Sequence, residues 1–170
     1  MQAEDNIVQI AESGEGPAVP ASFTDFFLDA HERLYRALYF VTGNPHDAEE
    51  LMQDAFMKLW ERWDRIDELD DATAYLFRVA FNGFRMRARR ARTAARRVIS
   101  IEPAPDPFAD VDIQQDVYRM LAGLSPRQRS ALVLTEIFGY SSEQAAEIMG
   151  IRPPTVRVLA SQGRAALRAT

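Results

Sequence analysis

The sequence predicts an all-α protein made of two small helical domains joined by a proline-containing linker, with a helix-turn-helix in the C-terminal domain. Three observations predict this class. Apolar residues recur at spacings of three and four, and no alternating segment is long enough for a sheet. Prolines at every second position interrupt the helical pattern at Pro103, Pro105 and Pro107. A serine-capped helix, a glycine turn and another helix follow one another near the C-terminus.

Size and composition fit this class. The chain has 170 residues, 47% of them apolar, which suffices for one ordinary domain or two small ones. It has no cysteine, which excludes disulfides, thiol catalysis and cysteine zinc sites and suits a reducing cytoplasm. No apolar run approaches the roughly 20 residues of a membrane span, and residues 1–22 lack the pattern of a signal peptide. We expect a cytoplasmic protein without membrane insertion, and a flexible tail over residues 1–22.

The N-terminal domain is expected over residues 23–97, as three helices. The first keeps a helical period from Phe23 and ends at Gly43-Asn44-Pro45, a sequence typical of a helix end. A clean amphipathic helix starts just after Asp47. After an acidic connection, a third helix runs from about residue 72 to 97, and arginines replace apolar residues in its second half.

The linker is expected over residues 98–112, because alternating prolines forbid a regular helix. The C-terminal domain then covers residues 113–170 with four short helices. In its helix-turn-helix, Ser141-Ser142 begins the first helix and Gly150 supplies the positive φ of the turn. Such a motif lays its second helix in the major groove of DNA, although the same pattern also fits a simple corner between core helices. The second helix offers Thr155 and Arg157 to base edges, with Arg152 and Arg164 nearer to phosphates.

Charge is distributed in blocks that the net value of −5 hides. Residues 1–71 hold 17 acids and 5 bases, whereas residues 72–97 hold 8 arginines and no acid. Residues 98–118 hold 5 acids and no base, and residues 119–170 hold 7 bases and 3 acids. An acidic block joined to a basic block indicates two different partners for one chain.

The third helix combines aromatic residues with arginines, which suits the bases and backbone of single-stranded nucleic acid. Phe77 and Phe81 fall to one side of its apolar stripe, and the amide of Asn82 could hydrogen-bond a flipped base. A core helix with a solvated basic end is the alternative. The candidate contacts of this helix with nucleic acid are Tyr75, Phe77, Arg78, Phe81, Asn82, Arg85, Arg89, Arg90 and Arg92.

The second helix carries acids on its outer side, and Asp47, Glu50 and Asp54 share one face. That face is either solvated or docks a basic partner helix, and Trp60 anchors the core or that partner. Catalysis and metal binding find no support. His31 and His46 lack further ligands at metal spacing, and no glycine-rich phosphate loop or activated nucleophile occurs. We expect no enzyme and no cofactor.

Over about residues 23–168, the chain resembles the extracytoplasmic-function (group IV) branch of the sigma-70 family. Residues 47–60, DAEELMQDAFMKLW, resemble the segment that docks on the clamp of the largest polymerase subunit. Residues 74–82, AYLFRVAFN, resemble the segment that melts and holds the minus-ten element. Residues 124–129, LSPRQR, and the helix-turn-helix resemble the domain that reads the minus-thirty-five element.

The resemblance implies a transcription initiation factor that binds core RNA polymerase, recognises promoter DNA and melts it without hydrolysing nucleotide. It implies contacts with the polymerase clamp and flap and an anti-sigma partner. It adds Arg127 to the minus-thirty-five contacts. The polymerase-binding residues that it implies are Asp47, Glu50, Gln53, Asp54, Phe56 and Trp60.

Two alternatives stay open: a helix-turn-helix regulator that acts without polymerase, and a helical module that sequesters a partner. The recognition helix departs from the family pattern, with Val158 and Leu159 after Arg157 and with a mid-helix Gly163. Fewer basic residues, and a glycine that costs a helix about 1 kcal/mol, predict altered minus-thirty-five contacts.

Overall fold

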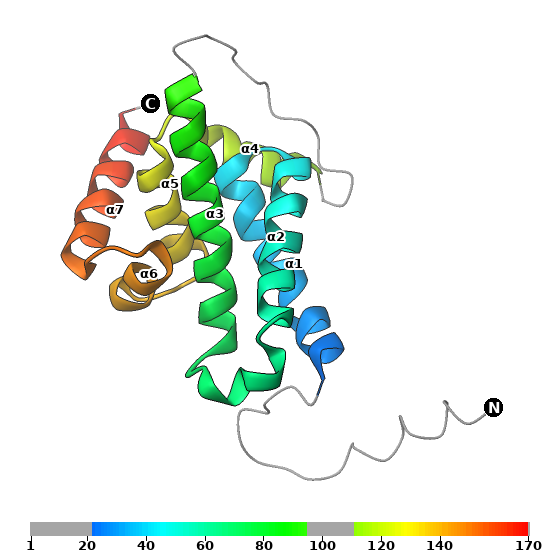
Figure 1. Cartoon of the computed structure of the whole chain (residues 1–170). Coiled ribbons are helices and arrows are strands. Elements are labelled where there is room, and N and C mark those ends of the chain that lie inside the picture. Colours follow the sequence, from blue (N-terminus) through cyan, green and yellow to red (C-terminus); the bar gives the residue numbers. More distant parts are fainter. Residues whose placement is uncertain (1–21, 95–110, 170) are drawn as a thin grey trace.

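The computed structural model describes residues 22–94 and 111–169 and confirms the all-α class, since all regular elements in these ranges are helices (Figure 1). Most of the expected linker, and all of the expected tail except Ser22, lie outside the described residues. The elements are α1 (Phe23–Thr42), α2 (Pro45–Trp60), the 3₁₀ helix η1 (Trp63–Glu68), α3 (Ala72–Ala94), α4 (Val111–Ala122), α5 (Pro126–Leu132), the π-helical turn η2 (Val133–Ile137), α6 (Ser142–Met149) and α7 (Pro153–Arg168).

Local caps set the boundaries in the N-terminal domain. The side chain of Ser22 accepts a hydrogen bond from the Asp25 amide and begins α1. Gly43, with φ 66°, ends α1 in the left-handed conformation, as expected. The Asn44 side chain then caps α2, and Pro45 occupies its first turn. The second helix therefore begins before Asp47 rather than after it, because Asn44 provides the cap that we had assigned to no residue.

The core of the N-terminal domain lies between α1, α2 and α3. Leucines from all three helices are fully buried there, among them Leu34, Leu59 and Leu76. A cluster of aromatic rings closes the end formed by the start of α1 and the end of α2. In it, the Phe23 ring centroid lies 4.8 Å from that of Trp60 and 5.2 Å from that of Trp63.

The helix-turn-helix forms as the sequence predicts. Ser125 and Ser141 each make a capping box, with Gln128 and Gln144 respectively, and begin α5 and α6. Gly150, with φ 65°, makes the turn to α7.

The structure gives Gly163 a role that differs from our interpretation. It is buried where α7 crosses α5, and a Cβ built at this position would lie 2.8 Å from a methyl carbon of Leu132. The glycine therefore permits a close helix crossing, and the cost to helix propensity is offset by packing.

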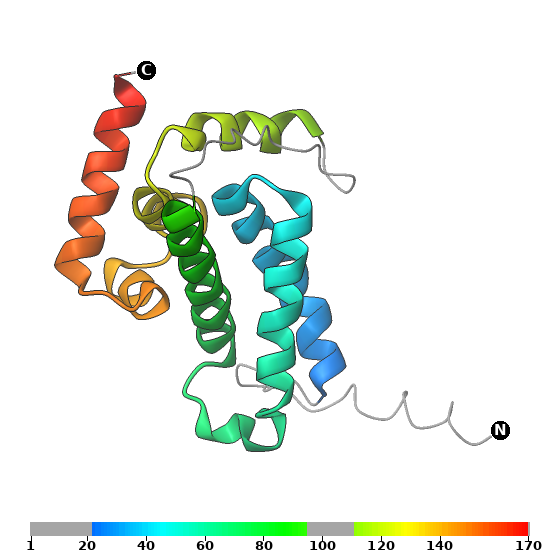
Figure 2. The same ribbon diagram turned by 45° about the horizontal axis from the view of Figure 1, so that its top comes forward.

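The two domains pack against each other, with α3 in the middle (Figure 1). One side of α3 contacts α1 and α2, and the other contacts α5 and α6. Turned as in Figure 2, the molecule shows α4 lying across the end where α1 finishes, and the two helices are in contact. This closed arrangement of the domains determines which of the predicted surfaces are accessible.

Candidate functional site

The outer face of α2 divides into a paired half and an open half. The Arg87 Nη1 of α3 lies 2.9 Å from a carboxylate oxygen of Glu50 and 3.3 Å from one of Asp47. These two acids therefore tie α2 to α3 as well as facing solvent. Asp54 and Gln53 are exposed one turn further along, and no ion pair found in the described residues involves Asp54. Asp54 is thus the acid on this face that is free to meet a basic partner.

An exposed apolar patch extends this face towards the end of α2. The side chains of Met57 and Trp60 are 64% and 60% exposed and stand three residues apart. Large exposed apolar side chains on a charged helix face are typical of an interaction surface. The sequence pattern indicated Trp60 but not Met57, although Met57 stands one turn before Trp60 on the same helix. Phe56, an expected docking residue, is buried against Phe27 and contributes packing.

The aromatic residues of α3 face the C-terminal domain. Phe77 and Phe81 are buried and lie nearly parallel, with centroids 6.3 Å apart. The ring of Phe77 meets Tyr140 edge-on at 5.6 Å and Phe138 at 6.4 Å. Phe77 and Phe81 lie to one side of the apolar stripe of α3, as predicted. In the closed arrangement they are covered by protein rather than open to a base.

A guanidinium from α1 joins this aromatic cluster. Arg33 lies 5.2 Å from the ring centroid of Tyr140, 5.7 Å from that of Phe138 and 5.9 Å from that of Phe77. Its Nη2 also donates a hydrogen bond to the Phe138 carbonyl oxygen at 3.3 Å. Burial raises the pKa of Tyr140 above its usual value. The contacts of Arg33 link the N-terminal and C-terminal domains.

The polar candidates of α3 remain on the surface. Asn82 accepts a hydrogen bond from Arg85 at 2.7 Å, so its amide is already oriented by a neighbouring candidate. Tyr75 is partly buried, and Arg62 lies 5.6 Å from its ring centroid. The other arginines of the predicted set are exposed: Arg78, Arg89, Arg90 and Arg92.

The outward face of α7 presents fewer free cations than the sequence suggests. Arg157 lies 3.3 Å from a carboxylate oxygen of Glu143, and Arg164 lies 2.5 Å from one of Glu136. Thr155 is half-buried, and Arg152 is exposed at the start of the helix. Val158 stands beside Arg157 and is 53% exposed. Arg127, on α5, lines a cavity against α3 and is not part of the α7 surface.

A second contact between the domains is built around Arg129 of α5. Its Nη1 donates to the Val41 carbonyl oxygen of α1 at 2.7 Å, and its Nη2 donates to the Leu124 carbonyl oxygen at 3.2 Å. The guanidinium lies 5.7 Å from the ring centroid of Tyr118, which itself packs on Gly43. Burial lowers the pKa of Arg129, yet arginine stays charged at any ordinary pH. Sequence reasoning did not find this contact.

Two negative findings concern the described residues alone. Within residues 22–94 and 111–169, no group of three or more His, Cys, Asp and Glu side chains is placed to hold a metal ion. In the same ranges, no helix combines the length and the apolar character needed to cross a membrane.

Comparison with known proteins places the chain in a family. The model of Sigma-70 region 2 matches residues 26–94, and that of Sigma-70, region 4 matches residues 114–167. The ECF RNA polymerase sigma factor SigE of Mycolicibacterium smegmatis is 30% identical over 167 residues, which cover 92% of this chain and 63% of SigE. The RNA polymerase sigma-E factor of Streptomyces avermitilis is 30% identical over 151 residues, covering 86% of this chain and 83% of that protein.

Solved structures show the same arrangement of helices. The sigma factor RpoE in complex with the anti-sigma factor NepR from Bartonella quintana has a TM-score of 0.70 and 28% identity, covering 86% of this chain and 94% of RpoE. CnrH in complex with the cytosolic domain of CnrY has a TM-score of 0.62 and 25% identity, with 86% and 85% coverage. Both matches span more of the chain than either domain alone. The chain therefore belongs to the extracytoplasmic-function branch of the sigma-70 family of transcription initiation factors.

Proposed function

We propose that the chain binds core RNA polymerase through the open half of α2 and directs it to promoters with α3 and α7. The observation that carries this proposal is the arrangement of α2 beside α3. An acidic and apolar face with Asp54, Met57 and Trp60 adjoins a helix whose exposed side is rich in arginine. One face suits a basic protein partner, and the other suits the phosphates of DNA.

Promoter melting requires the closed arrangement to open. Phe77 and Phe81 are buried under the C-terminal domain and cannot stack on unpaired bases there. On polymerase, the two domains would separate, and α3 would expose these rings beside its arginines. Captured bases would then offset the cost of unpairing, which is a few kcal/mol per flipped base.

We base the proposed protein partner of the chain on a complex solved for a relative. RpoE was solved with the anti-sigma factor NepR, and its likeness to this chain extends over both domains. An anti-sigma protein that holds the closed arrangement would keep the rings of α3 covered and the factor inactive. Because a sigma factor acts on RNA polymerase, we place the action of this chain in the cytoplasm. We also assign the chain to group IV of the family.

The proposal is tested by transcription with core RNA polymerase, with and without this chain, on a library of duplex promoters and on templates with a premelted bubble. We expect specific initiation only when the chain is present. If the chain alone retains duplex DNA while polymerase neither binds it nor initiates, a polymerase-independent helix-turn-helix regulator explains the protein instead.

Replacing Trp60 by alanine should weaken binding to core polymerase by about 2 kcal/mol, or roughly thirtyfold, because exposed aromatic anchors dominate protein interfaces.

Asp54→Arg should also weaken binding to core polymerase. This charge reversal is cleaner than Glu50→Arg, because Glu50 pairs with Arg87. Fluorescence anisotropy of labelled protein titrated with core polymerase measures both. Leu28→Ala, at an exposed apolar residue of α1, is the matched control. If Leu28→Ala and Trp60→Ala weaken binding to core polymerase equally, the docking surface lies elsewhere.

Val158 is expected to recognise a thymine methyl group in the minus-thirty-five element. It is an exposed apolar residue on the outward face of α7, and that methyl is the apolar feature of the major groove. Replacing thymine by deoxyuridine one position at a time removes only the methyl. At one position, we expect deoxyuridine to weaken holoenzyme binding by about 1 kcal/mol, or roughly fivefold, relative to thymine. Val158→Ala should abolish this difference between the two promoters. A promoter that tolerates deoxyuridine at every position would contradict the assignment.

A further inference from the structure

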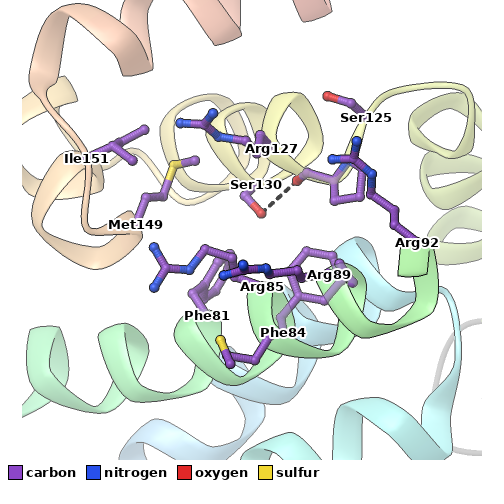
Figure 3. Close-up of a pocket in the computed structure, with 13 residues that line it drawn as sticks. Phe81, Phe84, Arg85, Arg89, Arg92, Ser125, Arg127, Ser130, Met149 and Ile151 are labelled. Atoms are coloured by element: carbon purple, nitrogen blue, oxygen red, sulfur yellow. Dashed lines mark hydrogen bonds between the residues drawn. The ribbon is translucent and has the colours of Figure 1, made fainter. Parts of the chain in front are cut away.

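A cavity of about 610 Å³ lies between α3 and the C-terminal domain (Figure 3). From α3 it is lined by Arg85, Arg89 and Arg92, which follow one another at intervals of one turn. Opposite them, α5 contributes Arg127 and Ser130, and Figure 3 shows Arg85 and Arg89 across the space from these two side chains. The cavity therefore brings positive charge from two domains into one place.

No acid among the described residues balances the charge in this cavity. Within residues 22–94 and 111–169, its lining includes four arginines and no aspartate or glutamate. None of the ion pairs found in the described residues involves these four side chains. Closing the domains brings Arg127 towards the α3 arginines, and this repulsion opposes closure. An anion in the cavity would turn the repulsion into attraction.

Apart from Ser125, the rest of the lining is apolar. Phe81 and Phe84 of α3, with Met149 and Ile151 of the helix-turn-helix, lie beside the arginines. Guanidinium groups bind phosphate oxygens strongly, and apolar and aromatic side chains favour contact with a ring of the ligand. The volume is in the range of small-molecule sites, which are about 300–1,000 Å³.

We propose that this cavity binds an organic phosphate of nucleotide size and that the ligand stabilises the closed arrangement. Because the ligand contacts both domains, it binds the closed form more tightly than the open one, and closure strengthens its binding in return. Phe81 and the α3 arginines are shared with the proposed DNA surface. The ligand and single-stranded DNA therefore exclude each other, and a small molecule would oppose promoter melting.

The first test is calorimetric titration of the full chain with three probes: ADP, inorganic pyrophosphate and adenosine. We expect ADP to bind best, pyrophosphate more weakly and adenosine least. Arg89→Ala should weaken ADP binding about tenfold, because it removes a charge-assisted hydrogen bond donor. Arg90→Ala is the matched control, since Arg90 is the next residue on the same helix, is exposed, and does not line the cavity. Equal weakening by the two variants, or no binding of ADP, would overturn the proposal.

The second test measures closure directly, with one fluorescent dye on each domain and ionic strength held constant. We expect ADP to increase the fraction of closed molecules and to raise the concentration of single-stranded oligonucleotide needed for binding. Arg127→Ala should remove the effect on closure, because it deletes the contribution of the C-terminal domain, and should leave only the direct competition at the α3 arginines. ADP binding without any change in closure would overturn the proposed coupling. Neither test uses polymerase, so failure here leaves the proposed role in transcription intact.

Discussion

Gly43→Ala is expected to lower the free energy of unfolding by about 3–5 kcal/mol, a large part of the stability of a small protein. Two costs combine at this position. The backbone has a φ of 66°, which a residue with a Cβ adopts at a cost of about 1–2 kcal/mol. A methyl group would also overlap the ring of Tyr118, which packs on the glycine from the other domain. Urea unfolding followed by circular dichroism measures the loss.

Gly150→Ala separates these two costs. Gly150 also ends a helix, has a φ of 65°, and a Cβ there would meet only Arg85 at an ordinary contact distance of 3.7 Å. We expect this control to lose only the 1–2 kcal/mol of backbone strain. Combining Gly43→Ala with Tyr118→Ala should recover the overlap cost, which a double-mutant cycle reports as a coupling energy. Equal losses at Gly43 and Gly150 would mean that Tyr118 is not held against α1 in solution.

Local features of the fold could be predicted because their causes are local. A serine followed three residues later by glutamine is a common local signal for the start of a helix, and Ser141 shows this at the helix-turn-helix. The left-handed glycine that ends α1 has the same kind of local cause. The start of α2 was misplaced because Gly43-Asn44-Pro45 was interpreted only as the end of the preceding helix, whereas Asn44 also caps the next one.

The closed arrangement could not be predicted, because its contacts leave no pattern in the sequence. Arg129 donates to the backbone carbonyl of Val41, which lies 88 residues away. Any residue at position 41 would present the same carbonyl. The helical period did separate Phe77 and Phe81 from the core stripe of α3, but it could not say that protein covers them. The close approach at Gly163 was hidden for the same reason, since only the structure brings Leu132 to it.

The two domains are held by contacts that a factor active on DNA has to break. Arg129 joins the two domains, because it donates to the Val41 carbonyl in one and the Leu124 carbonyl in the other and lies over Tyr118. The Val41 carbonyl that it binds is near the end of α1, where carbonyl groups lack helical partners and favour a cation. Removing the guanidinium leaves these groups without their partner in the closed form, whereas water reaches them in the open form. A change at Arg129 should therefore favour opening more than unfolding.

Arg129→Leu is expected to weaken closure by about 2–3 kcal/mol, which raises the ratio of open to closed molecules by roughly 30-fold to 160-fold. Energy transfer between dyes on the two domains should fall, and affinity of the free factor for single-stranded DNA should rise as Phe77 and Phe81 become accessible. Arg119→Leu is the matched control, because Arg119 is exposed on α4 and, among the described residues, pairs with its own helix alone, through Asp116 and Gln115. If both variants leave energy transfer and DNA affinity unchanged, Arg129 does not hold the domains together. If Arg129→Leu opens the molecule while DNA affinity stays constant, the aromatic face of α3 is not what binds the single strand.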